Sequence, residues 1–159
     1  MKNDLNEDIT PNEIKFYKTT EAYGEFSNFA KYPVFLKSKL WPTNEHYFQA
    51  QKFAGTELEE TIRFAPTAFV ATKLGRSKGT PIRDDWNNCK DNIMRKVVFA
   101  KFTQHECIGR MLINTGSVQI IEHTKNDFYW GDGENGEGLN MLGKILIEMR
   151  DLIRGLNLL

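Results

Sequence analysis

The stretch Trp41–Phe53, with the sequence WPTNEHYFQAQKF, constrains the fold most strongly, because it predicts a helix that carries aromatic residues on several sides. Pro42 stops the extended segment before it, since proline fixes φ and has no N–H to donate. Thr43 is a good helix N-cap, because its hydroxyl can accept an orphan backbone N–H of the first turn. Residues that favour helices follow, and Gly55 ends the run. We therefore expect one short helix across most of this stretch.

Four side chains share one face of this predicted helix: Glu45, Phe48, Gln49 and Lys52. Glu45 and Lys52 lie about two turns apart, roughly 10 Å along the axis, so both could converge on a molecule held between them. Two interpretations stay open. A helix face with Glu, Gln and Lys is most often exposed to solvent. The neighbouring aromatic residues instead favour a buried helix, in which a charged group needs a partner or a chemical role.

The size and charge of the chain exclude several classes of protein. Its 159 residues allow one domain with a substantial core, but hardly two. A formal net charge of zero gives no bulk attraction to nucleic acid or to an anionic membrane. No apolar run is long enough to span a membrane, and the polar N-terminus is no signal peptide. We therefore expect a cytoplasmic protein, or a nuclear or phage-encoded one, with no membrane partner.

The two cysteines, Cys89 and Cys107, fall in stretches with helical character. Neither has the CxxC or Cys/His spacing of a structural zinc site. We expect both to be reduced and packed, as in a cytosolic protein. The sequence predicts no metal site and no cofactor.

Hydrophobic periodicity and breaker residues predict the remaining elements. Residues 1–12 have the composition of a flexible tail, and residues 13–159 form the domain. We expect strands at residues 13–18, 34–37, 118–123 and 128–130, and helices at residues 57–64, 66–74, 86–104, 107–114 and 139–154.

Three loops carry groups that could bind a ligand. In residues 75–79, two cations between glycines suit the approach of a phosphate, although such a loop is more often a solvated turn. The glycine-rich loop 134–138 precedes a helix N-terminus, which can bind an anion. Its Glu134 and Glu137 oppose a diphosphate and favour contact with the hydroxyls of a sugar. Asn28 offers an amide at a loop tip, or simply closes an Asx-turn.

The central stretch resembles the signature of the NADAR family, also called YbiA-like, and further segments agree in the same order along the chain. One departure is Thr43, where Ser is expected, and the capping role is kept. Tyr129, where Phe is common, should be a neutral change. The agreeing segments are Phe26–Asn28–Phe29, Gly75-Arg76, Arg83–Asp85-Trp86, Met94, Lys101-Phe102, Leu112–Thr115-Gly116, Trp130-Gly131-Asp132-Gly133 and Gly138-Leu139-Asn140–Leu142-Gly143.

This resemblance, over residues 14–154, implies an α+β fold: a single compact, helix-rich domain with a small, mainly antiparallel β-sheet. It also implies a pocket for a ribosylated, nucleotide-like small molecule and hydrolysis of its N-glycosidic bond. Family members are associated with phosphoribosylamino-pyrimidine intermediates of riboflavin synthesis. They are also associated with ADP-ribose on guanine, which would make ADP-ribosylated guanine in nucleic acid a partner.

Cleavage of a ribosyl C–N bond builds positive charge at C1 of the sugar, which a nearby carboxylate stabilises. We expect Glu45 to supply that carboxylate, because the dipole at the first helical turn favours its ionised form. Asp132 would be the second acidic group, from the opposite side. Lys52 would form a Schiff base with the sugar if burial lowers its pKa, or bind the phosphate or leaving group as a cation.

Binding roles are predicted for a wider set of residues. Two tryptophans would stack the base, unless they belong to the core, and two arginines are candidates for a phosphate. His46 lies beside the Glu45 face and should pack. The alternative to an enzyme is a non-catalytic module that binds ADP-ribose or a nucleotide; an adaptor protein with a solvated helix face is a third possibility. The predicted substrate-binding residues are Asn28, Gln49, Arg76, Arg83, Trp86, Trp130, Gly131 and Asn140.

Overall fold

The computed structural model describes residues 12–159, which form six α-helices, one 3-10 helix and two pairs of strands. The strands are β1 (Glu13–Phe16), β2 (Val34–Leu36), β3 (Lys39–Trp41) and β4 (Gln119–Glu122); the α-helices are α1 (Asn44–Gln51), α2 (Glu57–Arg63), α3 (Ala68–Gly75), α4 (Trp86–Gln104), α5 (Glu106–Asn114) and α6 (Met141–Gly155); and η1 (Gly24–Phe26) is the 3-10 helix.

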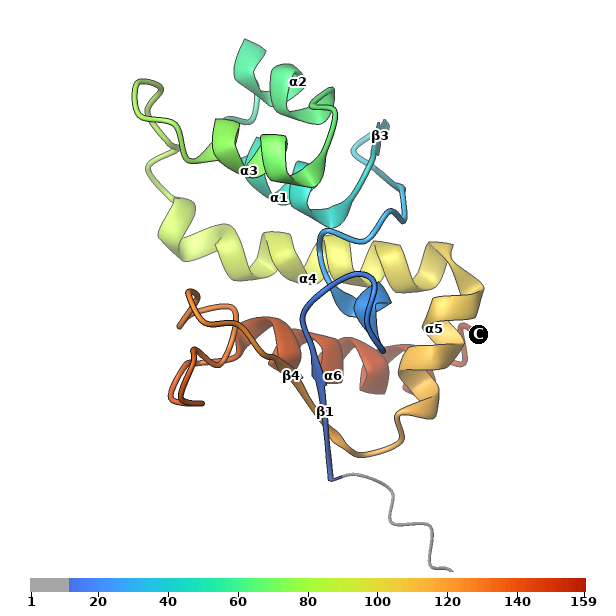
Figure 1. Ribbon diagram of the computed structural model, residues 1–159. Helices are drawn as coiled ribbons and strands as arrows, with labels where there is room; N and C mark the ends of the chain where they lie inside the picture. Colours follow the sequence, from blue (N-terminus) through green and yellow to red (C-terminus); the bar gives the residue numbers. More distant parts are fainter. Residues whose placement is uncertain (1–11) are drawn as a thin grey trace, which may run out of the picture.

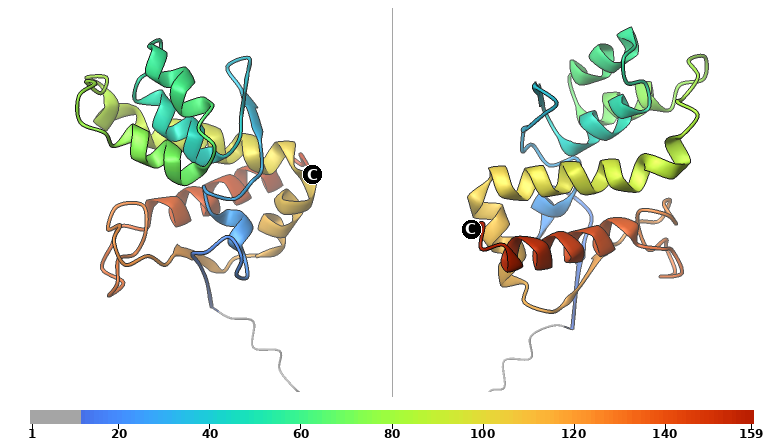
Figure 2. Two further views of the ribbon diagram at one scale, coloured as in Figure 1. Left: turned by 45° about the horizontal axis from the view of Figure 1, so that its top comes forward. Right: turned by 180° about the vertical axis from the view of Figure 1, so that it is seen from behind.

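The long helix α4 runs through the middle of the domain (Figure 1). On one side of it lie α1, α2 and α3 together with the hairpin of β2 and β3. On the other side lie α5, α6 and the pair formed by β1 and β4, and α4 and α6 run side by side in both Figure 1 and Figure 2. Among the described residues, every helix is too short or too polar to cross a bilayer.

The predicted α+β, helix-rich domain is confirmed, with one difference in the sheet. Its strands form two separate pairs, because β1 pairs in parallel with β4, and only β2 and β3 pair in antiparallel fashion. The predicted strand at 128–130 is wrong: the Asp127 carboxylate accepts the N–H groups of Tyr129 and Trp130, at 2.9 and 2.7 Å, and turns the chain there. Of the predicted tail, residues 1–11 lie outside the described residues, and the carbonyl of Asn12 accepts the Gln119 N–H.

The central helix is buried, which decides between the two interpretations of its polar face. All eight residues of α1 are buried, and Thr43 caps the helix by accepting the His46 N–H. Trp41 and Tyr47 pack edge to face with their ring centroids 5.2 Å apart, and both are almost fully buried. The Trp41 indole donates to the Leu36 carbonyl at 3.0 Å, so this core tryptophan leaves no polar group unpaired.

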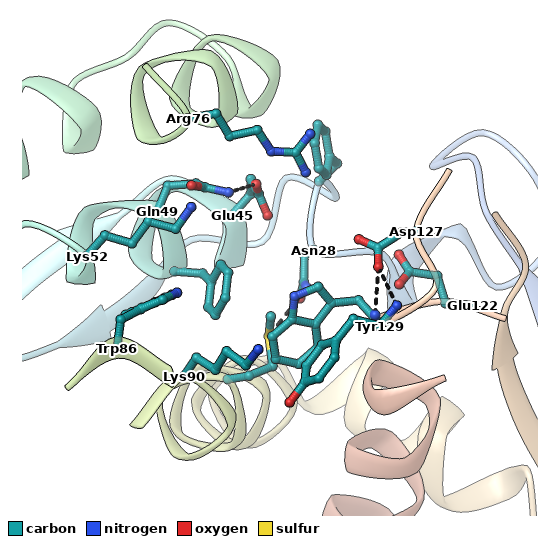
Figure 3. Close-up of a pocket in the computed structure, with 14 residues that line it drawn as sticks. Asn28, Glu45, Gln49, Lys52, Arg76, Trp86, Lys90, Glu122, Asp127 and Tyr129 are labelled. Carbon is teal, nitrogen blue, oxygen red and sulfur yellow. Dashed lines mark hydrogen bonds between the residues drawn. The ribbon is translucent and has the colours of Figure 1, made fainter. Parts of the chain in front are cut away.

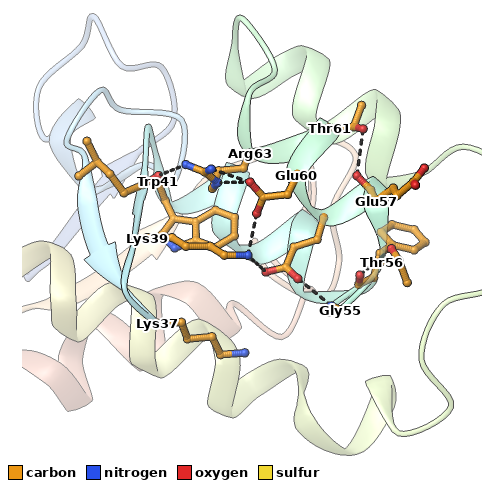
Figure 4. Close-up of polar contacts among 12 residues, drawn as sticks. Lys37, Lys39, Trp41, Gly55, Thr56, Glu57, Glu60, Thr61 and Arg63 are labelled. Carbon is orange, nitrogen blue, oxygen red and sulfur yellow. Dashed lines mark hydrogen bonds and ion pairs between the residues drawn. The ribbon is translucent and has the colours of Figure 1, made fainter.

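An ion-pair network fastens α2 to the hairpin (Figure 4). The Lys39 ammonium lies 3.1 Å from Glu59 and 2.6 Å from Glu60, and Glu60 also accepts from Arg63. The Glu59 carboxylate reaches back to the Gly55 N–H at 2.7 Å, at the start of α2. Because most of these groups are partly exposed, the network orients α2 and adds little stability.

We expect Gly143→Ala to destabilise the fold by about 1–3 kcal/mol, because it forces extra volume into a tight contact. A Cβ at Gly143 would lie 2.1 Å from the backbone oxygen of Ile120, where α6 crosses β4. The matched control is Gly155→Ala at the end of the same helix, where a Cβ meets nothing within 4 Å. Thermal unfolding of both variants checks this, and equal melting temperatures would contradict it.

Candidate active site

A cavity of about 330 Å³ opens between α1, α3, α4 and the loop that follows β4 (Figure 3). Glu45, Gln49 and Lys52, which the sequence predicted to share one face of a helix, all line this cavity. The residues that line it are Asn28, Phe29, Glu45, Phe48, Gln49, Lys52, Arg76, Trp86, Lys90, Met94, Glu122, Asp127, Tyr129 and Trp130.

Only one of the two carboxylate oxygens of Glu45 is hydrogen-bonded to the protein. Its Oε1 accepts from the Gln49 amide and from the Thr72 hydroxyl, both at 2.7 Å, and the residue is only 7% exposed. Its Oε2 has no hydrogen-bond partner among residues 12–159 and faces the cavity (Figure 3). The site therefore presents one fixed oxygen lone pair to whatever enters.

Lys52 lies on the same wall, one helical turn beyond Gln49. Its Nζ donates to the Gly75 carbonyl at 3.2 Å and lies 5.8 Å from the centre of the Trp86 ring. Burial lowers the pKa of Lys52; the Glu45 carboxylate opposes that shift, and the Arg76 guanidinium adds to it. A larger share of neutral amine is the result, as a nucleophilic lysine requires.

His46 plays a packing role, as expected. Its Nε2 lies 3.0 Å from the Ala65 carbonyl and its Nδ1 lies 2.8 Å from the Thr43 hydroxyl. Burial lowers the pKa of His46, so the neutral imidazole is favoured. This histidine joins the start of α1 to the segment after α2 and does not line the cavity.

Three aromatic rings form part of the cavity wall beside Glu45 and Lys52. Phe48 lies 5.0 Å from the Trp86 ring and 5.2 Å from the Trp130 ring, centroid to centroid. Both tryptophans are half-buried, so each keeps part of its surface for a ligand while it also packs against the core. A planar base would find stacking surfaces here.

Asn28 sits deep in the cavity on the loop after η1. Its amide donates to the Met94 sulfur at 3.4 Å and accepts from the Asn44 amide at 3.1 Å. The loop is fixed by the fully buried Lys101, whose ammonium donates to the carbonyls of Glu25 and Ser27. Burial lowers the pKa of Lys101 to about 7.

Four of the residues predicted from the sequence do not line the cavity. The Asp132 carboxylate turns back to the His123 ring at 2.9 Å and to the Thr124 N–H at 3.2 Å. Arg83 pairs on the surface with Asp85. Asn140 bonds the backbone of β4, and Gly131 packs where a Cβ would meet Thr124 at 2.1 Å. The structure thus gives these residues local partners in place of a ligand.

Three charged residues that line the cavity were not predicted from the sequence: Glu122, Asp127 and Lys90. Glu122 ends β4 and faces α1 across the cavity (Figure 3). Burial, together with the negative charges of Asp127, Glu45 and Asp132, raises the pKa of Glu122 to about 8. The only sequence signal for Glu122 was its position as an acidic residue at the end of a short strand. Many residues in such positions bind no ligand.

Two cations lie on the cavity rim. Arg76, at the C-terminal end of α3, is exposed and has no ion-pair partner within residues 12–159. Lys90 of α4 holds its ammonium 3.7 Å from the centre of the Tyr129 ring. Both can reach an anionic group of a bound molecule. The described residues contain no cluster of three or more side chains arranged as a metal site.

The cysteines differ from the expectation in one respect. Both are free thiols within helices, and Cys89 is half-buried near the start of α4. Cys107, however, is exposed, because it falls on the outer side of α5 and not on its packed face.

A compact α+β domain whose carboxylates, amine and aromatic rings converge on one cavity is built to bind a small polar molecule and to act on it. The NADAR domain model matches residues 15–154, and this chain belongs to that family.

Relatives and a solved structure agree with this assignment. The chain is 47% identical over 138 residues to the N-glycosidase YbiA of Shigella boydii, covering 87% of this chain and 86% of that protein. It is 34% identical over 169 residues to the chloroplastic riboflavin biosynthesis protein PYRR of Zea mays, covering 95% of this chain and 27% of that protein. The NMR structure of E. coli YbiA superposes with a TM-score of 0.85 at 44% identity, covering 92% of this chain and 87% of that chain.

Proposed function

We propose that this protein hydrolyses the N-glycosidic bond of a ribosylated, nucleotide-like small molecule. The observation that carries the proposal is the free Glu45 oxygen, which faces the same aromatic-walled cavity as the Lys52 amine. The family membership and the names of the relatives support the same reaction. A module that only binds its ligand would have no need to bury a carboxylate with one unpaired oxygen.

Glu45 supplies negative charge where the reaction creates positive charge. As the C1–N bond breaks, its electron pair stays on nitrogen and C1 becomes cationic. The fixed Oε2 stabilises that charge and orients the water that attacks C1. The hydrogen bonds from Gln49 and Thr72 prevent the carboxylate from turning away.

Lys52 has two possible roles, and we favour the covalent one. An aminoribosyl sugar can open to an iminium at C1, and the neutral Lys52 amine can exchange with the departing nitrogen to form a Schiff base. The lowered pKa of Lys52 supports this role. In the other role, a protonated Lys52 binds the phosphate or the leaving group.

The cavity suits one nucleoside-sized group. Its volume of about 330 Å³ is at the small end of ligand pockets. A phosphoribosylamino-pyrimidine would place its base between the rings and its phosphate near Arg76 and Lys90. ADP-ribose on guanine would leave its adenylate part outside the cavity. The smaller metabolite is therefore our preferred substrate, and ADP-ribosylated guanine in nucleic acid is the second candidate.

A hydrolysis panel tests this function. Purified protein is offered phosphoribosylamino-pyrimidines and ADP-ribosyl-guanosine at equal concentrations, and release of the free base is followed by chromatography. We expect turnover of the pyrimidine substrates at the higher kcat/KM. Absence of hydrolysis of every substrate in the panel would refute the proposed function.

Charge reversal at the rim should weaken binding and spare the chemistry. We expect Arg76→Glu to raise KM by about tenfold to a hundredfold, the loss of roughly 1.4–2.8 kcal/mol of binding energy, with kcat changed less. Lys78→Glu, on an exposed cation in the same loop that does not line the cavity, is the matched control. Steady-state kinetics with the best panel substrate measures both variants, and an unchanged KM for Arg76→Glu would count against a phosphate at this position.

A further inference from the structure

Three carboxyl groups lie on the side of the cavity opposite α1, and their hydrogen bonds distinguish them. Asp132 accepts from His123 and Thr124 and does not line the cavity. Asp127 lines it, but accepts two backbone N–H groups, which occupy its Oδ1 and fix it as a turn residue. The Glu122 carboxyl has no hydrogen-bond partner among residues 12–159 and is directed into the cavity (Figure 3).

The backbone of Glu122 is fixed from both sides. Its N–H donates to the Asn140 side chain at 3.0 Å, and its carbonyl accepts the Asp132 N–H at 2.9 Å. The Asn140 amide also donates to the Ile120 carbonyl at 2.9 Å, so it spans the strand from α6. Asn140, which was predicted to bind the substrate, instead holds the backbone of Glu122, which lines the cavity.

The strand geometry explains why Glu122 reaches the cavity. Residues two apart on a strand point to the same face, so Glu122 follows Ile120. Ile120 is fully buried in the core between β4 and α6. Glu122 lies two residues beyond Ile120, where the core ends. Its side chain therefore points into the cavity, opposite Glu45 (Figure 3).

We propose that Glu122 is the general acid that protonates the departing nitrogen, an inference that rests on the proposed N-glycosidase function. The Glu122 carboxyl gives its proton to the glycosidic nitrogen while the C1–N bond breaks and its electron pair stays on nitrogen. Water then bonds to C1, either directly or by displacing the Lys52 amine that has taken up C1 first, and the extra proton of the water passes to the Glu45 carboxylate. The free amine and the free sugar leave, after which Glu45 releases a proton and Glu122 takes one up from solvent.

The electrostatic environment supports this division between the two glutamates. With its pKa near 8, Glu122 carries a proton at neutral pH. The acidic groups that act on it are Asp127, Glu45 and Asp132, while Lys52, Arg76 and Lys90 line the same cavity. Two carboxyl groups held in different environments are the usual basis for an acid and a base in one site. The leaving nitrogen needs the proton of Glu122 whether water or the Lys52 amine forms the new bond to C1.

The test compares two ribosides that share a sugar phosphate but differ in their leaving group: an amine-linked pyrimidine and a nitrophenyl ether. Nitrophenolate departs without a proton. We expect Glu122→Gln to lower kcat for the amine-linked substrate by about 10²–10⁴-fold and to leave the nitrophenyl substrate within about tenfold. Glu45→Gln should slow both substrates. Similar losses for both substrates in Glu122→Gln, or a selective loss in Asp127→Asn instead, would overturn the assignment.

The pH profile gives a second measurement that needs no variant. An acid works only while protonated, so we expect kcat/KM of the wild type for the amine-linked substrate to fall as pH rises through about 8, the pKa of Glu122. The nitrophenyl substrate should show no such fall. Identical alkaline limbs for the two substrates would overturn the assignment. A wild type that hydrolyses neither substrate refutes the N-glycosidase function itself, whereas an active wild type that shows no leaving-group dependence refutes only the role of Glu122.

Discussion

Glu45→Gln is expected to lower kcat by about 10²–10⁴-fold while substrate affinity changes only a few-fold. The amide has the shape of the carboxylate, and its oxygen can still accept from Gln49 and Thr72. What is lost is the negative charge on the atom that faces the cavity. The measurement is kcat and KM with the best panel substrate, together with substrate affinity by calorimetry.

The matched control is Glu57→Gln, the same change on an exposed glutamate of α2 that does not line the cavity. It should leave both constants near those of the wild type. If Glu45→Gln kept both affinity and turnover, the buried carboxylate would have no chemical role. The protein would then be better described as a module that binds its ligand.

Lys52→Gln is expected to lower kcat by at least about 10³-fold, since removal of a covalent nucleophile leaves only binding and electrostatic effects. Lys52→Arg should fail equally, because a guanidinium keeps the charge but cannot form a Schiff base. Borohydride added during turnover of the wild type should attach the mass of the sugar to the peptide that contains Lys52. Mass spectrometry of the digested protein reads out this adduct.

Lys78→Gln provides the comparison, because Lys78 is an exposed lysine outside the cavity. This variant should keep both the adduct on Lys52 and the activity. If no adduct forms under conditions of turnover, the Schiff base is excluded. Substantial activity of Lys52→Arg would then identify Lys52 as a cation that binds the phosphate or the leaving group.

Local sequence signals were sufficient for the helical part of the site. Pro42 ends the preceding extended segment, and Thr43 caps α1 by accepting the His46 N–H. Helical spacing placed Glu45, Gln49 and Lys52 together, and all three line the cavity. These features depend on neighbours within one or two turns, which periodicity and capping describe well.

The opposite wall depends on contacts that no local pattern describes. Asp132 follows an aromatic residue and a glycine in a motif that resembles the family signature, yet its carboxylate bonds to His123, nine residues earlier. Glu122 reaches the cavity because β4 pairs in parallel with β1 and its backbone is held by Asn140, 18 residues further along the chain. The parallel pairing itself joins segments more than a hundred residues apart in the sequence, and no short-range signal fixes its register.

The sequence by itself determined the central helix, its cap and the polar face that carries one carboxylate and one amine. Whether that face was buried, and which acid faced it, was decided only when β4, α4 and the loop after β4 closed around it. The physical reason is the range of the interactions: hydrogen bonds within a helix join residues four apart, whereas a cavity wall is set by the packing of distant segments.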